Sequence, residues 1–249
     1  MVSAQTTSHT RGTLRSGDRD SALVIHDHLR SQILEGRLGA GSEINQAQVA
    51  AQFGISRGPV REAFRLLERD GLIDTKINHR ARVAALSVDD LEHLYTLRVL
   101  NESLALSVSV PRLTPPELDE LAELADVLRA PNPRTFDFEA WDHVHQRFHL
   151  LLLTHSGPRM IDSAAGWMAH TQRYRRTYAE GGRGLPPGAA EHAQLTQLSR
   201  DRDAAGAARL LALHLSRAAL TLIAQMAPTH EPVLLRAAIR QVAGPNGRG

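Results

Sequence analysis

The 249-residue sequence predicts a mainly α-helical protein of two domains, with β-structure confined to one short hairpin in the first. Apolar residues recur at helical spacing along most of the chain, and no strand-like alternation of useful length follows the hairpin. Positive charge is concentrated early, because residues 1–85 contain 12 Lys and Arg against 9 Asp and Glu, whereas the remainder contains 17 against 18. We expect a disordered tail at 1–20, a first domain at 21–85, an all-α second domain at 86–228 and a C-terminal extension at 229–249.

The first domain begins with two predicted helices. The first helix is predicted by an apolar stripe that consists of Ile25, Leu29 and Ile33. This stripe ends at Gly36. Asn45 is a suitable N-cap for a second, shorter helix, and Gly54 ends it. Gly54 and Ile55 then form a tight turn into a third helix, which makes a helix-turn-helix.

The third helix runs from Ser56, a good N-cap, to Gly71, which closes it. Pro59 falls in the first turn, where its missing N–H is not needed. The stripe that faces the core consists of Val60, Phe64 and Leu67.

A row of arginines lies on a different face of this third helix. Arg57, Arg61 and Arg65 are spaced i, i+4, i+8 and therefore share one side. Guanidinium groups near the start of a helix suit phosphates and the O6/N7 edge of guanine. The alternative is an ordinary solvated face, because Glu62 and Glu68 partly balance the arginines.

Two short strands follow, at residues 72–77 and 82–84. The hairpin tip between them runs from Asn78 to Ala81 and carries His79 and Arg80. Three helices and a basic hairpin make a winged helix-turn-helix. The wing would lie along the minor groove or the DNA backbone beside the third helix.

Residues 24–84 resemble the DNA-binding domain of the GntR superfamily of bacterial transcription regulators. The matching segments are ILEGRLGAGSEI, QVAAQFGISRGPVREAFRLLERDGLI and HRARV. Two positions depart from the family pattern: the usual glycine at the wing tip is replaced, and the position after Arg57, often a hydroxyl residue, is Gly58. We expect the DNA contacts to come from Ser56, Arg57, Gly58, Arg61, Arg65, Asn78, His79 and Arg80.

The second domain is predicted to be entirely helical. Ser87 begins a capping-box start to a helix that Pro111 stops, and Thr114 begins a second such start. Further helical patterns cover roughly 136–155, 159–178, 189–200 and 203–226, with a short terminal helix at 233–242.

Four histidines of this domain are candidate metal ligands. His145 and His149 are four residues apart on one helix, so their imidazoles point the same way. His192 and His214 lie on two later helices. Imidazoles from three helices that converge in a bundle make a first-row divalent metal site plausible. The alternative is that each is a half-buried histidine bonded to a carbonyl.

Residues 88–222 resemble the FCD ligand-binding domain, the effector domain of the FadR-like branch of the GntR superfamily. Phe148-His149 matches its "FH" motif, Glu191-His192 its "EH" motif, and His214 its last-helix histidine. The resemblance implies a metal held by one Asp or Asn and three histidines, beneath a pocket for a small carboxylate.

This chain has His145 where the family usually has Asp or Asn. Three arrangements stay open: a four-imidazole site, a three-histidine site with His145 at its edge, or a rearranged site that uses Asp142. An all-nitrogen ligand set shifts the preference toward Zn, Ni or Cu ions, and zinc is our expectation.

Arg98 occupies the family's arginine position on the first effector-domain helix. A buried arginine needs a carboxylate, either internal Glu102 or an acidic effector held in bidentate fashion. Tyr174 is a core residue and a weaker candidate for contact with the effector. A nearby cluster could line the pocket or lie exposed, and consists of Arg173, Arg175 and Arg176.

These observations predict a metabolite-responsive transcription regulator with no catalytic residues. The implied partners are double-stranded operator DNA, a small organic acid and a second copy of the chain. A regulator that senses the metal ion itself is the first alternative, and a metal-dependent hydrolytic enzyme is the second. No carboxylate is placed as an obvious general base beside the histidines, which disfavours the enzyme. Whether the regulator represses or activates stays open.

Composition limits the remaining possibilities. The chain has no cysteine, which excludes disulfides and thiolate metal sites. The first twenty residues are polar and do not resemble a signal peptide. We find no apolar stretch of 18 residues and expect a cytoplasmic protein without a membrane partner.

Overall fold

The computed structural model describes residues 18–76, 80–129, 136–179 and 188–244. Most of the predicted tail and the wing-tip residues Asn78 and His79 lie outside these ranges. The chain divides into two compact units, Met1–Ala85 and Leu86–Gly249.

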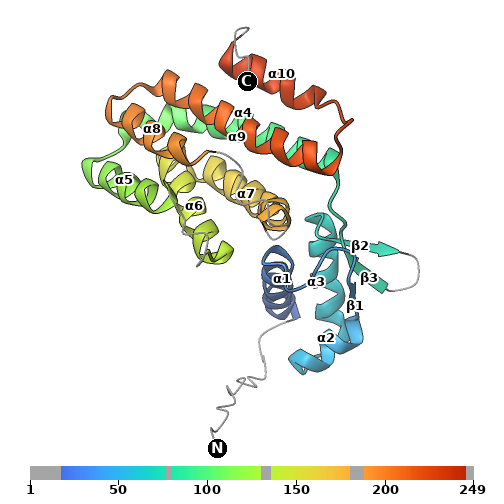
Figure 1. The fold of residues 1–249 in the computed structure, drawn as a ribbon. Coiled ribbons are helices and arrows are strands. Elements are labelled where there is room, and N and C mark those ends of the chain that lie inside the picture. The colour runs from blue at the N-terminus through green and yellow to red at the C-terminus, as the bar shows by residue number, and fades with distance from the viewer. Residues whose placement is uncertain (1–17, 77–79, 130–135, 180–187, 245–249) are drawn as a thin grey trace, which may run out of the picture. The chain divides into compact units, whose positions relative to one another are not determined.

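The first unit contains three helices and three short strands (Figure 1): α1 (Asp18–Leu34), β1 (Glu43–Ile44), α2 (Gln46–Phe53), α3 (Arg57–Arg69), β2 (Ile73–Lys76) and β3 (Arg80–Val83). Helix α1 begins inside the segment predicted to be a disordered tail, so that boundary was wrong by three residues. The apolar stripes of α1 and α3 face each other, as predicted, and their buried residues are Ile25, Leu29, Ile33, Val60, Phe64 and Leu67.

The helix ends of this unit agree with the sequence except at one cap. The Asn45 side chain accepts hydrogen bonds from the backbone N–H groups of Ala47 at 2.8 Å and Gln48 at 3.3 Å. Gly54 ends α2 in the left-handed conformation, with φ of 66°. Ser56 occupies the N-cap of α3, but its hydroxyl makes no capping hydrogen bond. The prediction about Ser56 therefore holds for its position and fails for the bond.

The three strands form one antiparallel sheet in the order β1-β3-β2. The sequence analysis missed β1, because two residues are too few to show alternation. It also placed Arg80 in the hairpin tip, whereas β3 begins at this residue and pairs it with Lys76. Arg82 explains the attachment of β1: its guanidinium donates to Gly41 O at 3.1 Å and lies 3.6 Å from the Glu43 carboxylate.

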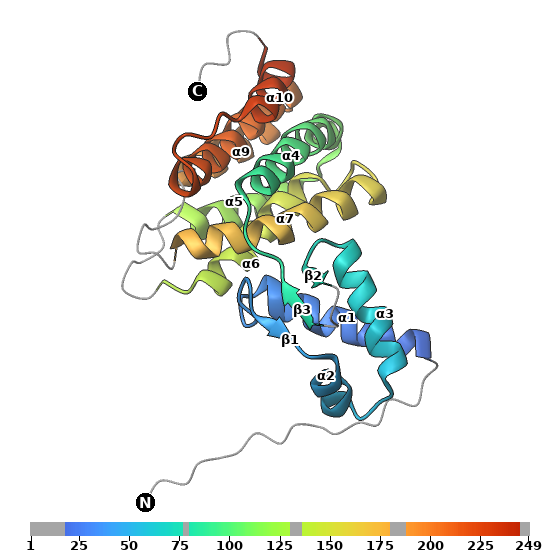
Figure 2. The same ribbon diagram turned by 90° about the vertical axis from the view of Figure 1, so that its right-hand side faces the viewer.

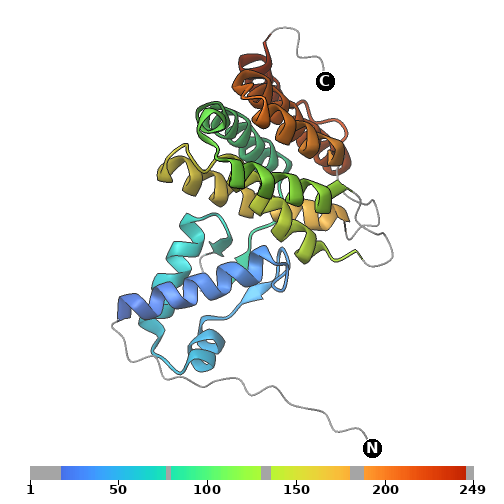
Figure 3. The same cartoon turned by 90° about the vertical axis from the view of Figure 1, so that its left-hand side faces the viewer.

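The second unit is all-helical in its described residues, as predicted. Its α-helices are α4 (Val88–Ser109), α5 (Pro115–Arg129), α6 (Phe138–Leu152), α7 (Pro158–Tyr178), α8 (Ala189–Arg200), α9 (Ala204–Met226) and α10 (Val233–Ala243), and a 3-10 turn, Val110–Arg112, follows α4. Helix α4 packs against α7, α9 and α10 (Figure 2), while α5 packs against α6 and α8 (Figure 3).

The predicted capping residues start the first two helices of this unit. The Ser87 hydroxyl accepts from Asp90 N at 3.4 Å. Before α5, the Glu117 carboxylate accepts from the Thr114 backbone N–H at 2.7 Å and from its hydroxyl at 2.8 Å. These bonds satisfy N–H groups that the helix itself leaves unpaired.

Helix α9 contradicts the expectation that the chain has no apolar stretch of 18 residues. By length and composition it is apolar enough to cross a membrane, but 61% of its most apolar window is buried inside the protein. It contacts α4, α8 and α10 and carries Arg209 and Arg217. This combination is typical of the core helix of a bundle.

Candidate functional site

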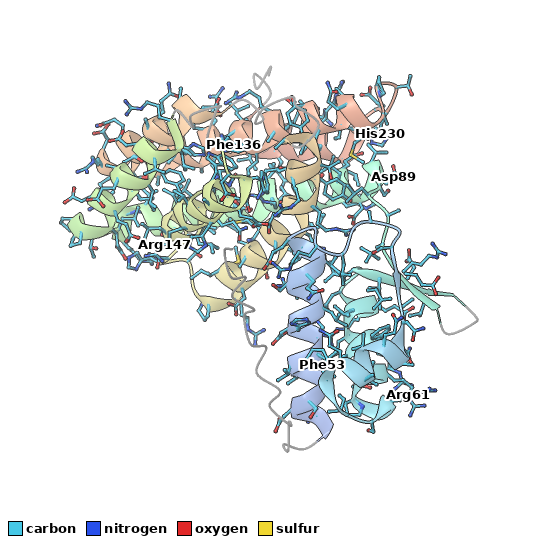
Figure 4. The ribbon with its side chains drawn as sticks, turned by 60° about the horizontal axis from the view of Figure 1, so that its bottom comes forward. Phe53, Arg61, Asp89, Phe136, Arg147 and His230 are labelled. Carbon is cyan, nitrogen blue, oxygen red and sulfur yellow. The ribbon has the colours of Figure 1, made fainter. Side chains whose placement is uncertain are left out.

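The predicted DNA-binding row lies on the exposed side of α3. Arg57, Arg61 and Arg65 are all exposed, and Figure 4 shows Arg61 projecting outward from the unit. Arg65 lies 3.4 Å from Glu62, a weak surface pair, and Arg57 and Arg61 form no ion pair with any described residue. The row is therefore available to phosphates or base edges.

The structure brings His145, His149, His192 and His214 together in the interior of the second unit. Helix α6 supplies the first two, α8 supplies the third and α9 the fourth. All four are buried, and one ring nitrogen from each lies within 4.8 Å of the others. Four imidazole nitrogens gathered this closely are a ligand set that proteins use for metal ions, so this four-histidine cluster could hold a metal ion.

The ring nitrogens of this cluster are poorly satisfied by the protein. Both nitrogens of His149 and both of His192 are buried and have no hydrogen-bond partner within the described residues. Burial, followed by the neighbouring positive charges, lowers the pKa of His145 and His149 well below the usual value. Burial and His214 lower the pKa of His192 to about 2. These three rings are therefore neutral at physiological pH, and each has one nitrogen lone pair to offer.

Two carboxylates lie behind the cluster. Nδ1 of His214 lies 2.8 Å from Oε2 of Glu191, and Arg217 pairs with the other oxygen of that carboxylate. Oε2 of Glu102 lies 4.0 Å from Nδ1 of His149. A carboxylate on Nδ1 fixes the tautomer of an imidazole and leaves Nε2 for a metal.

Gly188 adds a steric constraint at His214. A Cβ atom placed on Gly188 would lie 2.7 Å from Cε1 of His214, closer than real Cβ contacts come. Glycine at this position therefore allows the backbone at the start of α8 to lie directly against the imidazole.

Asp142, the alternative ligand, is engaged elsewhere. Its Oδ1 accepts from Arg175 at 2.6 and 3.2 Å, and its Oδ2 accepts from Gln146 at 2.6 Å. Asp142 is fully buried but does not belong to the cluster. Its partner Arg175 is equally buried, and the charge of Asp142 raises the pKa of that guanidinium against the effect of burial.

Arg98 is paired internally. Its Nε donates to Glu102 Oε1 at 2.6 Å, its Nη2 donates to Oε2 at 3.4 Å, and both side chains are almost completely buried. Its Nη1 donates to Thr171 Oγ1 at 3.0 Å, and Arg175 Nη1 donates to the same oxygen, also at 3.0 Å. One hydroxyl therefore joins two buried arginine–carboxylate pairs beside the cluster.

Tyr174 makes its polar contacts at the start of α4. Its hydroxyl donates to Asp90 Oδ2 at 2.7 Å and accepts from Ser87 N at 3.4 Å. Burial and the Asp90 carboxylate raise the pKa of Tyr174. The structure thus places Tyr174 at the residues that follow the boundary between the two units, and does not show its hydroxyl in contact with the cluster.

The sequence analysis gave no role to Glu191 or Thr171. Glu191 precedes His192 in the "EH" motif, and this adjacency was a usable signal for a carboxylate near the histidines. Thr171 carried no such signal, because its contacts join residues 73 positions apart in the chain.

Comparison with known families and proteins agrees with this architecture. Residues 22–83 match the family described as bacterial regulatory proteins, gntR family, and residues 93–217 match the FCD domain. The HTH-type transcriptional regulator YdhC of Bacillus subtilis is 33% identical over 140 residues, 56% of this chain and 62% of YdhC, a little under two thirds of that relative. The HTH-type transcriptional regulator BphR of Paraburkholderia xenovorans is 28% identical over 193 residues, 75% of this chain and 79% of BphR.

Solved structures show the same fold. McbR/YncC of E. coli aligns with a TM-score of 0.65 and 22% identity, covering 83% of this chain and 98% of that one. A GntR transcriptional regulator of Rhodococcus sp. RHA1 aligns with a TM-score of 0.69 and 19% identity, covering 85% and 100%. The chain belongs to the GntR family of bacterial transcription regulators, carries an FCD domain after its DNA-binding domain, and is a DNA-binding regulator and not an enzyme.

Proposed function

We propose that this regulator holds one divalent first-row metal ion, zinc in first place, on the four-histidine cluster, and that a small organic acid bound beside the ion alters its affinity for operator DNA. The observation that carries the proposal is the set of unsatisfied buried nitrogens on His149 and His192. Buried polar atoms without partners are rare in proteins, and an ion bound to one nitrogen of each ring would satisfy two of these four atoms at once.

The donor set fits a borderline or soft ion. Four imidazoles supply nitrogen only, which disfavours Mg²⁺ and Ca²⁺ and favours Zn²⁺, Ni²⁺ or Cu²⁺. We favour the four-imidazole arrangement for two reasons. A ring nitrogen of His145 lies within 4.8 Å of those of the other three histidines, and Asp142 is already hydrogen-bonded to Arg175. The bound ion would supply a positive anchor for a carboxylate.

The acid would bind close to Arg98. Metal, Arg98 and Arg175 carry more positive charge than Glu102 and Asp142 neutralise, so the interior has an excess of positive charge once an ion is present. An incoming carboxylate can take hydrogen bonds that Arg98 now gives to Glu102. Charge-assisted contacts of this kind contribute roughly 1.5–3 kcal/mol each.

Regulation would work by a shift in population between two dimer geometries. An acid that binds one geometry better changes the separation of the two α3 helices, and hence operator affinity. The homodimer makes physical sense because one recognition helix makes few base contacts. The protein would work in the cytoplasm, where operator DNA is found.

An operator titration tests the proposal and separates it from direct metal sensing. Operator affinity is measured on chelated protein and on zinc-loaded protein, each with and without a panel of small carboxylic acids. We expect one acid to change the affinity of the zinc-loaded protein only. A change on zinc loading alone, with no acid active, would support the metal sensor in place of the acid-responsive regulator.

His145→Ala resolves the ligand set. Complete loss of the ion from the dialysed variant is the outcome expected for a four-imidazole site. Partial loss would assign His145 to the edge of a three-histidine site, and unchanged occupancy would remove it from the site.

A further inference from the structure

One face of α4 carries apolar side chains that no described part of the chain covers. Leu97, Leu104 and Val108 are 43%, 61% and 39% exposed, and half-buried Leu100 lies between them. Successive members of this set are three, four and four residues apart, which aligns them in one stripe along the helix. Figure 2 shows α4 between α9 and α7, which cover its other faces. A continuous apolar stripe on a soluble domain marks a contact surface more often than isolated exposed residues do.

We propose that this stripe packs against the same stripe of a second copy, with the two α4 helices antiparallel about a two-fold axis between Leu100 and Asn101. The proposal rests on the homodimer of the proposed function and names its contact. Leu97 and Leu104 are equally distant from that midpoint, so an antiparallel pair sets Leu97 against Leu104 of the partner subunit. A contact that pairs a surface with itself in this way is the kind that a two-fold dimer requires.

The charges at the two ends of the stripe support the antiparallel direction. Asp89, in the first turn of α4, lies 3.7 Å from His230 and keeps a side chain that is 73% exposed. Arg112, in the 3-10 turn after the helix, is also exposed, and one of its Nη atoms donates to the carbonyls of Val108 and His155. Asp89 and Arg112 are again equally distant from the midpoint. An antiparallel pair brings each Asp89 toward Arg112 of the partner subunit, whereas a parallel pair would bring like charges together.

The apolar surface continues onto α10. Val233 and Leu234 are 62% and 50% exposed. Buried Glu92 of α4 accepts hydrogen bonds from Leu234 N at 2.7 Å and Leu235 N at 3.2 Å, which holds the start of α10 against the first turn of α4. The start of α10 therefore adds exposed apolar side chains near the acidic end of the stripe.

The stripe and the buried arginine pair share one helix. Arg98 directly follows Leu97, but its side chain lies on the inner side of α4 with Glu102, beside His149. A ligand that draws Arg98 away from Thr171 of α7 breaks a hydrogen bond between α4 and α7, and so can shift α4 and its contact with the partner subunit. This geometry gives the effector site a direct connection to the dimer interface.

Disulfide cross-linking tests the proposal, because the chain has no native cysteine. Residues 97 and 104 of one helix lie about 10 Å apart along its axis, beyond the reach of a disulfide. Leu97→Cys/Leu104→Cys should therefore cross-link only between copies, and so should Leu100→Cys, which lies in the stripe next to the axis. Leu97→Cys alone and Leu104→Cys alone should remain largely uncross-linked under the same mild oxidation.

The possible outcomes separate this proposal from the proposed homodimer. A wild-type dimer in sedimentation, with cross-linking of the double variant and of Leu100→Cys, supports both. A wild-type dimer without these cross-links overturns the α4 contact and leaves the dimer intact, as does efficient cross-linking of Leu97→Cys alone. A wild-type monomer at micromolar concentration overturns both.

A charge substitution gives a second, independent measurement. Leu104→Glu places a carboxylate in the centre of the contact and should raise the dimer dissociation constant on the order of a hundredfold, as expected for a central interface residue. Val127→Glu on α5, 59% exposed and outside the stripe, is the matched control and should leave the constant unchanged. Because Leu104 is exposed, both variants should fold. Equal dissociation constants for the two variants would contradict the α4 contact.

Discussion

Arginine side chains lie on the surface of α3 in the first unit and in the interior of α4 and α7 in the second. Arg57 and Arg61 are solvated and form no ion pair with the described residues, whereas Arg98 and Arg175 are buried and bound by Glu102 and Asp142. Exposed charges cost little to fold and remain available to a polyanion. Buried charges must be paired inside the protein or by a ligand.

This contrast predicts that the same substitution has different effects in the two units. In the first unit it should change DNA binding and leave stability alone, and in the second it should change stability first. Both tryptophans, Trp141 and Trp167, lie in the second unit, so tryptophan fluorescence reports the unfolding of that unit alone.

The largest effect is expected from Arg98→Met. The substitution leaves the Glu102 carboxylate buried without its partner, which should lower the unfolding free energy of the second unit by about 3–5 kcal/mol. Urea denaturation followed by tryptophan fluorescence measures it. Arg61→Met should stay within about 0.5 kcal/mol of wild type. Arg98→Met/Glu102→Leu should recover most of the loss, and a loss below about 1 kcal/mol for Arg98→Met alone would contradict the buried pair.

Acid should destabilise the metal-free second unit. The pKa values of His145, His149 and His192 are lowered in the folded chain by burial, so these rings take up protons on unfolding. Each such ring contributes a slope of about 1.4 kcal/mol per pH unit, so their stabilisation is fully present above about pH 6.5 and is lost as the pH falls below it.

Denaturation of chelated protein at pH 7 and 5.5 measures this dependence. Three rings together predict a loss of roughly 4 kcal/mol between these values. The matched control is His145→Gln/His149→Gln, which lacks the two buried imidazoles of α6 and should show a smaller dependence. Equal stability of the chelated wild type at both values would mean that the rings are not buried as described.

A smaller effect is expected on the operator. Arg57→Ala or Arg61→Ala should weaken specific binding by about 1–3 kcal/mol, the range for a bidentate base contact. The tryptophan-detected unfolding curve should not change. Titrations at one fixed salt concentration check this prediction, and wild-type affinity in both variants would move the DNA contact away from this face of α3.

Local patterns predicted the helices of both units well, because caps, glycines and apolar stripes act over a few residues. Asn45, Ser87 and Thr114 start helices where expected. Strand β1 was missed, because its two residues form a strand only through pairing with β3, which lies nearly forty residues away. The absence of a capping bond at Ser56 likewise depends on a side-chain rotation that the sequence does not specify.

The site was predictable to the level of residue types and helices, but not of partners. The spacing of His145 and His149 predicts a shared face, and motif resemblance added His192 and His214. The carboxylate with which each buried arginine pairs depends on how α4, α6 and α7 pack. For that reason the pairing of Arg175 with Asp142 and the shared contact of Thr171 emerged only from the structure.

The smallest expected effect is the difference in stability cost between removing two N-cap side chains of the first unit. Asn45→Ala removes two hydrogen bonds to the start of α2 and should cost about 1 kcal/mol, whereas Ser56→Ala should cost only a few tenths. Thermal unfolding followed by circular dichroism, with the second unit stabilised by zinc, measures the difference. Equal costs would show that Ser56 does cap α3 in solution.

The central claim is that the unsatisfied imidazoles of the second unit hold an ion, and elemental analysis of dialysed protein tests it most directly. The wild type should retain about one divalent first-row ion per chain, and His149→Ala/His192→Ala/His214→Ala should retain almost none. Loss of the ion should also lower the thermal stability of the second unit. Equal metal content in the two proteins would contradict the account, and the four buried histidines would then be part of the core alone.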